Sequence, residues 1–120
     1  MSLEIIKPFG PSIAKVVIPS EIVSSMNKYV EEVIKDEKKS KDLDYGNKLA
    51  GNVQQEFKLD LEFMKKNNWA EFLGKACQEW INKEHNISIK KFDIISSWIV
   101  RQFENEYNPI HYHDGHISGV

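Results

Sequence analysis

The sequence predicts an α+β fold, and two features of its residue pattern support this. Segments rich in β-branched residues lie at 3–18 and 87–103, whereas much of the chain between them carries apolar side chains at helical spacing. The chain has 120 residues, of which 41% are hydrophobic and 28% are charged, as in ordinary globular proteins. We therefore expect a single domain over residues 1–120.

Two short strands and a helix are expected in the first 35 residues. Residues 3–9 and 12–18 are rich in β-branched side chains, and Gly10-Pro11 between them is typical of a turn. A helix is predicted from Ser20 onward because the residues that follow form one apolar stripe. The stripe consists of Ile22, Met26, Val30, Val33 and Ile34.

The middle of the chain predicts a solvated loop, an irregular segment and two helical regions. Residues 35–44 are polar on all sides and indicate the loop, while residues 45–53 contain two glycines and show no clear period. One helical region is expected from about Leu59. Another is expected from about Asn68 to about Asn86, where apolar residues recur at helical spacing.

The last third of the chain favours strands. Residues 87–103 are rich in β-branched and aromatic side chains and predict one long strand. Residues 104–109 predict a turn, since Asn-Pro favours turn initiation. Residues 110–114 and 117–120 are expected to form further strands.

Composition excludes two classes of partner. The formal net charge is −2 and the basic residues are scattered among acidic ones, so nucleic acid is not an expected partner. No apolar run approaches the roughly 20 residues that cross a bilayer, so no membrane is expected. The N-terminus lacks the layout of a signal peptide, which favours the cytoplasm.

Cys77 is the single cysteine and is expected to be a small buried hydrophobe.

Three of the four histidines lie close together near the end of the chain, at positions 111, 113 and 116. In a strand, His111 and His113 would project from the same face, where two neutral imidazoles can bind one metal ion. Asp114 and His116 follow in a turn and offer a third donor if Gly115 lets the backbone fold back. The alternative is a solvent-exposed turn that happens to be rich in histidine.

The string from Trp98 to His113, followed by Ser118-Gly119-Val120, resembles a branch of the 2-oxoglutarate and Fe(II)-dependent oxygenases. This branch contains uncharacterised phage-like and marine-bacterial proteins. Its pattern is a strand with Trp, a short polar turn, a His-x-His pair, and Ser-Gly-Val leading into a further strand. The resemblance covers about the last quarter of the chain.

The resemblance implies the N-terminal half of a double-stranded β-helix, or jelly roll, with flanking helices. It also implies Fe(II) and 2-oxoglutarate as cofactors and hydroxylation of a C–H bond in an unknown small-molecule or protein substrate. By position His111 matches the first ligand of the facial triad. The second position holds His113 instead of the carboxylate usual in the superfamily, and Asp114 is displaced from it by one residue.

The resemblance also implies residues that are not in this sequence. The family's distal His and its Arg or Lys for 2-oxoglutarate would come after Val120, so we expect a truncated, catalytically incomplete oxygenase domain. Half a barrel exposes a strand edge, which predicts a homo-oligomer through the C-terminal strands. Arg101 and Gln102 are neighbours in the predicted strand, so only one of them can face the site, and each is expected to be an ordinary surface residue.

Two other classes of protein stay open. A cupin-like metal protein shares the His-x-His pair, but the Glu expected four or five residues later is replaced by Ile117 and Ser118. A non-catalytic interaction module would use residues 35–44 and exposed aromatic side chains. Metal binding separates this module from the metal proteins.

Overall fold

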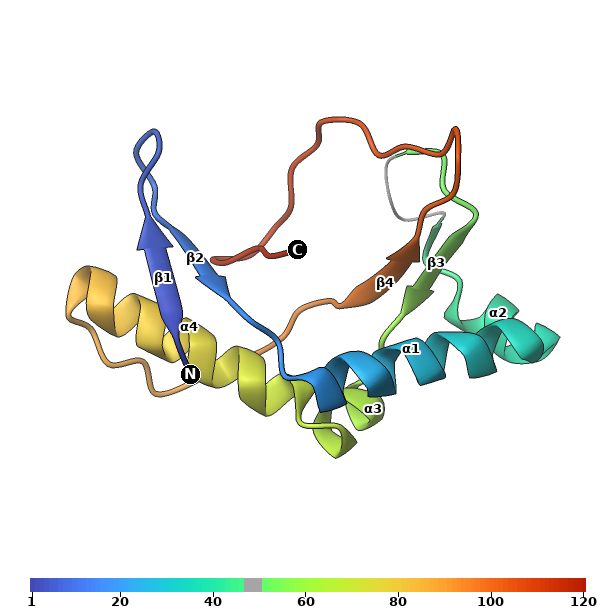
Figure 1. The fold of residues 1–120 in the computed structure, drawn as a ribbon, viewed down its shortest axis with the longest axis horizontal. Coiled ribbons are helices and arrows are strands. Elements are labelled where there is room, and N and C mark those ends of the chain that lie inside the picture. Colours follow the sequence, from blue (N-terminus) through green and yellow to red (C-terminus); the bar gives the residue numbers. More distant parts are fainter. Residues whose placement is uncertain (47–50) are drawn as a thin grey trace. The chain divides into compact units, whose positions relative to one another are not determined.

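A computed structural model describes residues 1–46 and 51–120 (Figure 1). These residues form four helices and two small antiparallel sheets, which confirms the predicted α+β class. The elements are β1 (Leu3–Ile6), β2 (Ile13–Val16), α1 (Ser20–Lys35), α2 (Glu37–Leu43), β3 (Gln55–Lys58), α3 (Leu61–Lys66), α4 (Trp69–His85) and β4 (Trp98–Arg101). Contacts divide the chain into two compact units, residues 1–27 with 61–94 and residues 28–60 with 95–120. The prediction of one domain stays a prediction.

In the first unit, the β1–β2 hairpin packs against α4. The strands pair in the register Leu3 to Val16, as the break at Gly10-Pro11 predicts. Gly10 has a φ of +124°, a backbone conformation that favours glycine. The indole N–H of Trp80 donates to the Ser12 hydroxyl at 2.9 Å, which joins the helix to the end of the hairpin turn.

Helix α4 forms where the apolar spacing predicts it. Asn68 and Asn86 bound it, and both have left-handed backbone conformations, which asparagine tolerates better than most residues. The buried side chains of this unit are Ile22, Met64, Ala76 and Cys77. Burial of Cys77 is therefore as predicted, and it raises the pKa of the thiol.

The core of the second unit lies between the second half of α1 and the β3–β4 pair. Val30, Val33 and Phe57 are buried together. Phe57 pairs with Ile99 in the antiparallel register, so these two side chains share one face of the sheet. Partly buried side chains complete the cluster, namely Tyr29, Ile34, Leu43 and Ile99.

The predicted loop at residues 35–44 is wrong, because residues 37–43 form helix α2. The Asp36 carboxylate accepts a hydrogen bond from the Lys39 backbone N–H at 3.1 Å and caps the helix. Glu37 and Lys41 form an ion pair one turn apart at 3.2 Å. Local capping therefore supports a helix that has no buried residue. The irregular segment predicted at 45–53 includes residues 47–50, which lie outside the described residues.

The strand predictions in the last third need correction. Only Trp98–Arg101 of the predicted strand 87–103 is a strand, and residues 110–120 contain none. The short strand β3 was not expected, and it pairs with β4 over four residues. A strand requires a partner backbone, and β-branched composition does not supply one. The turn predicted at residues 104–109 is confirmed at Glu104 and Asn105, where Asn105 has a φ of 66°.

No helix within residues 1–46 and 51–120 has the length and apolar character needed to cross a membrane. The homo-oligomer was expected to form through C-terminal strands, and the segment that would provide them is not a strand in this structure. Oligomerisation stays a prediction.

Candidate metal centre

The histidine cluster belongs to the second unit, where a backbone bridge and a side-chain hydrogen bond fix the chain that leads to it. Asn52 and Tyr107 form an isolated antiparallel bridge, with Asn52 N–H donating to the Tyr107 carbonyl at 2.8 Å. The Glu106 carboxylate accepts a hydrogen bond from the Gln54 N–H at 2.9 Å. These links hold residues 106–107 beside the segment that enters β3, a few residues before His111 in the sequence.

His111 and His113 are brought together, as predicted, although the segment is not a strand. Their Nε2 atoms lie 3.0 Å apart, and their ring centroids are 4.6 Å apart with planes at 83°. Both side chains are exposed. The two imidazoles are therefore neighbours on the surface of this unit, accessible to an ion from solvent.

The tautomer of His111 follows from its second ring nitrogen. Its Nδ1 lies 2.6 Å from the Pro109 carbonyl oxygen, which can only accept a hydrogen bond. Nδ1 therefore carries a hydrogen, and in the neutral ring Nε2 holds the lone pair. Metal-binding histidines are commonly fixed in this way by a backbone carbonyl.

The distances between the rings suit two ligands at right angles around one ion. With metal–nitrogen bonds of about 2.1 Å, such nitrogens lie about 3.0 Å apart and the ring centroids about 4.6 Å apart. A linear hydrogen bond between the two Nε2 atoms would place the centroids about 5.3 Å apart. The observed separations of 3.0 and 4.6 Å match the bent arrangement.

The ring of Trp98 packs beside His113, and the ring of Tyr45 packs beside Trp98. The ring centroid of His113 lies 5.4 Å from that of Trp98 on β4, and Trp98 in turn lies 5.4 Å from Tyr45. Trp98 is half-buried. Packing against a large ring restricts the rotamers of His113 and favours the position in which it meets His111.

Asp114 and His116 do not complete the site. Both are exposed, and they flank Gly115, whose φ of +104° lets the chain bend there. Within the described residues, no three His, Cys, Asp or Glu side chains gather in a way that could hold a metal ion. The structure thus assembles two of the donors that the sequence suggested, and Asp114 as a ligand stays a prediction.

Arg101 and Gln102 bind other groups. The Arg101 guanidinium pairs with Glu31 on α1 at 3.1 Å, and its register with Gln55 places it on the opposite sheet face from Trp98. The Gln102 amide donates to the Glu106 carbonyl at 2.7 Å. Each is thus bound to groups outside the histidine pair.

A buried carboxylate on β3, Glu56, was not predicted from the sequence. Glu56 is 2% exposed, and its Oε2 has no hydrogen-bond partner. Burial raises the pKa of this carboxyl, and the charges of Asp44 and Glu106 raise it further. Glu56 lies opposite Val100 in the antiparallel register, so their side chains point to the same face of the sheet. Trp98 is two residues before Val100 on β4 and therefore points to that face as well.

Glu56→Gln is expected to change how stability depends on pH. Because the folded-state pKa of Glu56 is raised, the folded chain holds this proton at pH values where the unfolded chain has lost it. The wild type therefore loses stability as pH rises through the raised pKa. We expect the variant to match the wild type near pH 4 and to exceed it by about 1–3 kcal/mol near pH 8.

Urea unfolding at several pH values measures this difference in free energy. Glu104→Gln is the matched control, because Glu104 is an exposed glutamate in the turn after β4. An advantage of Glu56→Gln that is constant across pH, or a loss at pH 8, would contradict a buried carboxylate without a partner.

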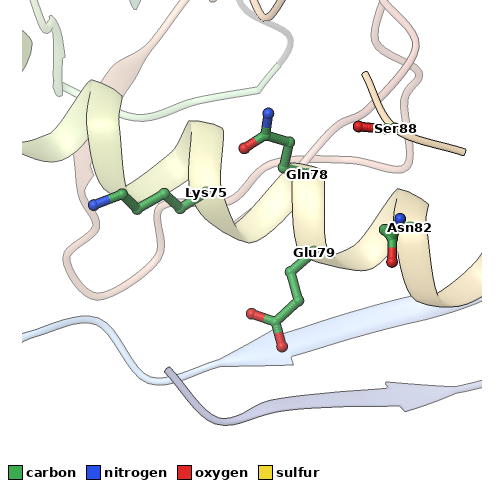
Figure 2. A pocket seen from close by; sticks show the side chains of 5 residues that line it. All are labelled: Lys75, Gln78, Glu79, Asn82 and Ser88. Carbon is green, nitrogen blue, oxygen red and sulfur yellow. The ribbon is translucent and has the colours of Figure 1, made fainter. Parts of the chain in front are cut away.

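A concave feature lies in the first unit, beside α4 (Figure 2). This open depression of about 390 Å³ is lined by polar residues, namely Lys75, Gln78, Glu79, Asn82 and Ser88. Its charged groups already have partners on the same helix, Lys75 with Glu71 and Glu79 with Lys83, each at 2.6 Å. It is therefore an ordinary solvated helix face and not a candidate site.

Comparison with protein-family models, with curated proteins and with solved structures gave no match for this chain.

Sequence reasoning missed the groups that orient the histidines. The Pro109 carbonyl and the Tyr45 ring are invisible to a search for ligand spacing, because one is backbone and the other is distant in sequence. Trp98 was noted as part of the predicted strand at residues 87–103 and of the family pattern, and not as a neighbour of His113. The Trp98 contact with His113 follows from the path of the chain after β4.

Proposed function

We propose that this chain carries part of the metal centre of a 2-oxoglutarate and Fe(II)-dependent oxygenase, with His111 and His113 as two imidazole ligands. The observation that supports it best is the pair of Nε2 atoms 3.0 Å apart, with the Nδ1–H of His111 held by the Pro109 carbonyl. The resemblance of residues 98–113 and 118–120 to the oxygenase branch names iron and the cosubstrate.

The two histidines fit two adjacent positions around such an ion. When bound, Fe(II) would supply open coordination positions for 2-oxoglutarate and oxygen. The chain's own contribution is to hold the hydrogen of His111 on Nδ1, so that Nε2 carries the lone pair, and to hold His113 against Trp98. Asp114 is the proposed third donor by its place in the sequence, and a change of its rotamer or of the bend at Gly115 would be needed to bring it in.

We further propose β3 and β4 as strands of a double-stranded β-helix. Support comes from their antiparallel pairing and from their two distinct faces. One face packs on α1 through Phe57 and Ile99, and the other carries Trp98, next to His113. A cytoplasmic location and a homo-oligomer belong to the same proposal.

Anaerobic titration with Fe(II) tests the proposed function. We expect one Fe(II) per chain and tighter binding of Fe(II) when 2-oxoglutarate is present, because a chelating cosubstrate fills positions that the protein leaves open. Isothermal titration calorimetry measures both effects. If the Fe(II) affinity is the same with and without 2-oxoglutarate, the result would support a metal site and contradict an oxygenase. Absence of Fe(II), Ni(II) and Zn(II) binding would favour the interaction module.

A further inference from the structure

Residues 51–54 lie against residues 106–108, in a contact that we call the clasp. A Cβ added at Gly51 would lie 2.5 Å from the Tyr107 carbonyl oxygen, closer still to the Asn108 side-chain oxygen, and 3.0 Å from the Asn108 Cα. Two of these three atoms belong to the backbone, so they cannot move aside by a side-chain rotation. Gly51 also has a φ of +112°, which favours glycine. The clasp therefore closes only around a residue without a side chain.

Hydrogen bonds hold the clasp closed. Asn52 and Tyr107 exchange both of their backbone hydrogen bonds, at 2.8 Å to the Tyr107 carbonyl and at 3.3 Å to the Asn52 carbonyl. The Gln54 N–H donates to the Glu106 carboxylate at 2.9 Å. The Glu106 carbonyl accepts in turn from the Gln102 amide at 2.7 Å, which fixes this side of the clasp to the end of β4. The close approach at Gly51 is therefore held by several bonds at once.

Little freedom of rotation separates the clasp from the Pro109 carbonyl. Asn108 belongs to the clasp, and Pro109 follows it directly in the sequence. The proline ring fixes its own φ at about −65°, and its Cδ restricts the backbone of the preceding residue to extended conformations. Because these dihedral angles are restricted, a displacement of Asn108 is passed on to the Pro109 carbonyl instead of being absorbed between them.

The Pro109 carbonyl in turn decides where His111 carries its hydrogen. Its oxygen lies 2.6 Å from Nδ1, so the hydrogen is on Nδ1 and the lone pair is on Nε2. A displacement of roughly 1 Å takes this pair of atoms beyond hydrogen-bond distance. Without the acceptor, neutral imidazole can adopt both tautomers, and in one of them Nε2 carries the hydrogen and cannot bind a metal ion.

We propose that Gly51 is a positioning residue for His111. Its bare backbone lets the clasp close on Tyr107 and Asn108, the closed clasp places the Pro109 carbonyl, and this carbonyl holds the hydrogen of His111 on Nδ1. A glycine far away in the sequence thus sets which ring nitrogen of His111 carries the lone pair. The use of that lone pair by a metal rests on the proposed function, but the position of the hydrogen does not, so it is measured without metal.

NMR of the metal-free protein with ¹⁵N-labelled histidine tests this role, at about pH 8.5 where imidazole side chains are neutral. In the wild type, Nδ1 of His111 should have the chemical shift of a nitrogen that carries hydrogen, and Nε2 that of a nitrogen without one. In Gly51→Ala, both shifts should move toward the average of two exchanging tautomers. A loss of stability alone would not move these shifts in the folded protein, so they separate positioning from a structural role.

Gly10→Ala is the matched control, because Gly10 has a similar φ of +124° and a Cβ there would meet no atom within 4 Å. It adds the same kind of backbone strain without the steric clash, so it should leave the His111 shifts unchanged. Glu106→Ala removes the acceptor of the Gln54 N–H and should move the His111 shifts in the same direction as Gly51→Ala, by a smaller amount. Because it introduces no clash, it keeps the test decisive if Gly51→Ala does not fold.

Calorimetric titration with Fe(II) gives a second readout, in which Gly51→Ala should weaken binding about 10-fold, as loss of a group that orients a ligand does. If the wild type binds no Fe(II), the proposed function fails, and the histidine shifts alone decide the role of Gly51. Unchanged His111 shifts in Gly51→Ala and Glu106→Ala would overturn the proposal. A wild-type His111 with its hydrogen on Nε2, or an equal change in Gly10→Ala, would also overturn it.

Discussion

Phe57→Ala is expected to lower the free energy of unfolding of the second unit by about 3–5 kcal/mol. Phe57 is 6% exposed and packs with Val30 and Val33, and it is the largest of these three buried side chains. Its removal takes away apolar burial and leaves a cavity between α1 and β3. Since small domains are stable by only about 5–15 kcal/mol, this is a large fraction of the total.

Urea unfolding followed by circular dichroism measures the loss. Phe9→Ala is the control, because Phe9 is 97% exposed in the hairpin turn and should change the free energy by less than about 0.5 kcal/mol. If Phe57→Ala does not fold, Phe57→Leu should still be destabilised, by about 1 kcal/mol. A loss below about 1 kcal/mol in Phe57→Ala would contradict this core.

His111→Ala is expected to weaken Fe(II) binding by at least about 100-fold, the scale on which metal sites respond to loss of a ligand or its support. The loss has two causes: one of the two assembled nitrogens disappears, and it is the one whose tautomer is fixed by the Pro109 carbonyl. His113→Ala should be similarly damaging, because one imidazole on an exposed segment holds metal poorly.

Calorimetric titration with Fe(II) measures these affinities, with His116→Ala and His85→Ala as controls. His85 ends helix α4 in the first unit, and His116 lies beyond the bend at Gly115, so neither should alter the affinity by more than about twofold. If His116→Ala is as damaging as His111→Ala, the site is built from a different set of donors.

Helices were predictable from the sequence where a buried stripe or a clear boundary exists. The stripe from Ile22 to Ile34 and the Asn68 and Asn86 boundaries of α4 are examples. Helix α2 was not predicted, because a helix without a buried face has no hydrophobic pattern in its sequence. The Asp36 cap and the ion pair between Glu37 and Lys41 support it instead. Strands were overpredicted, because side-chain preference does not reveal whether a partner backbone is present.

The proximity of His111 and His113 was predictable from the sequence, but strand geometry is not what brings them together. Spacing of two was expected to align His111 and His113 through strand geometry, yet the rings meet in a non-strand segment through the Pro109 carbonyl and the Trp98 ring. Glu56 could not be foreseen, since a Glu in a short strand normally points to solvent. Its burial becomes visible only from the strand pairing and packing of the folded chain.

X-ray absorption spectroscopy of the Fe(II)-loaded chain tests the proposed metal centre most directly. The proposal predicts two imidazole nitrogens at about 2.1 Å from the iron, and loss of the imidazole scattering in the double variant His111→Ala with His113→Ala. An iron environment of oxygen donors alone, or imidazole scattering that persists in the double variant, would contradict it.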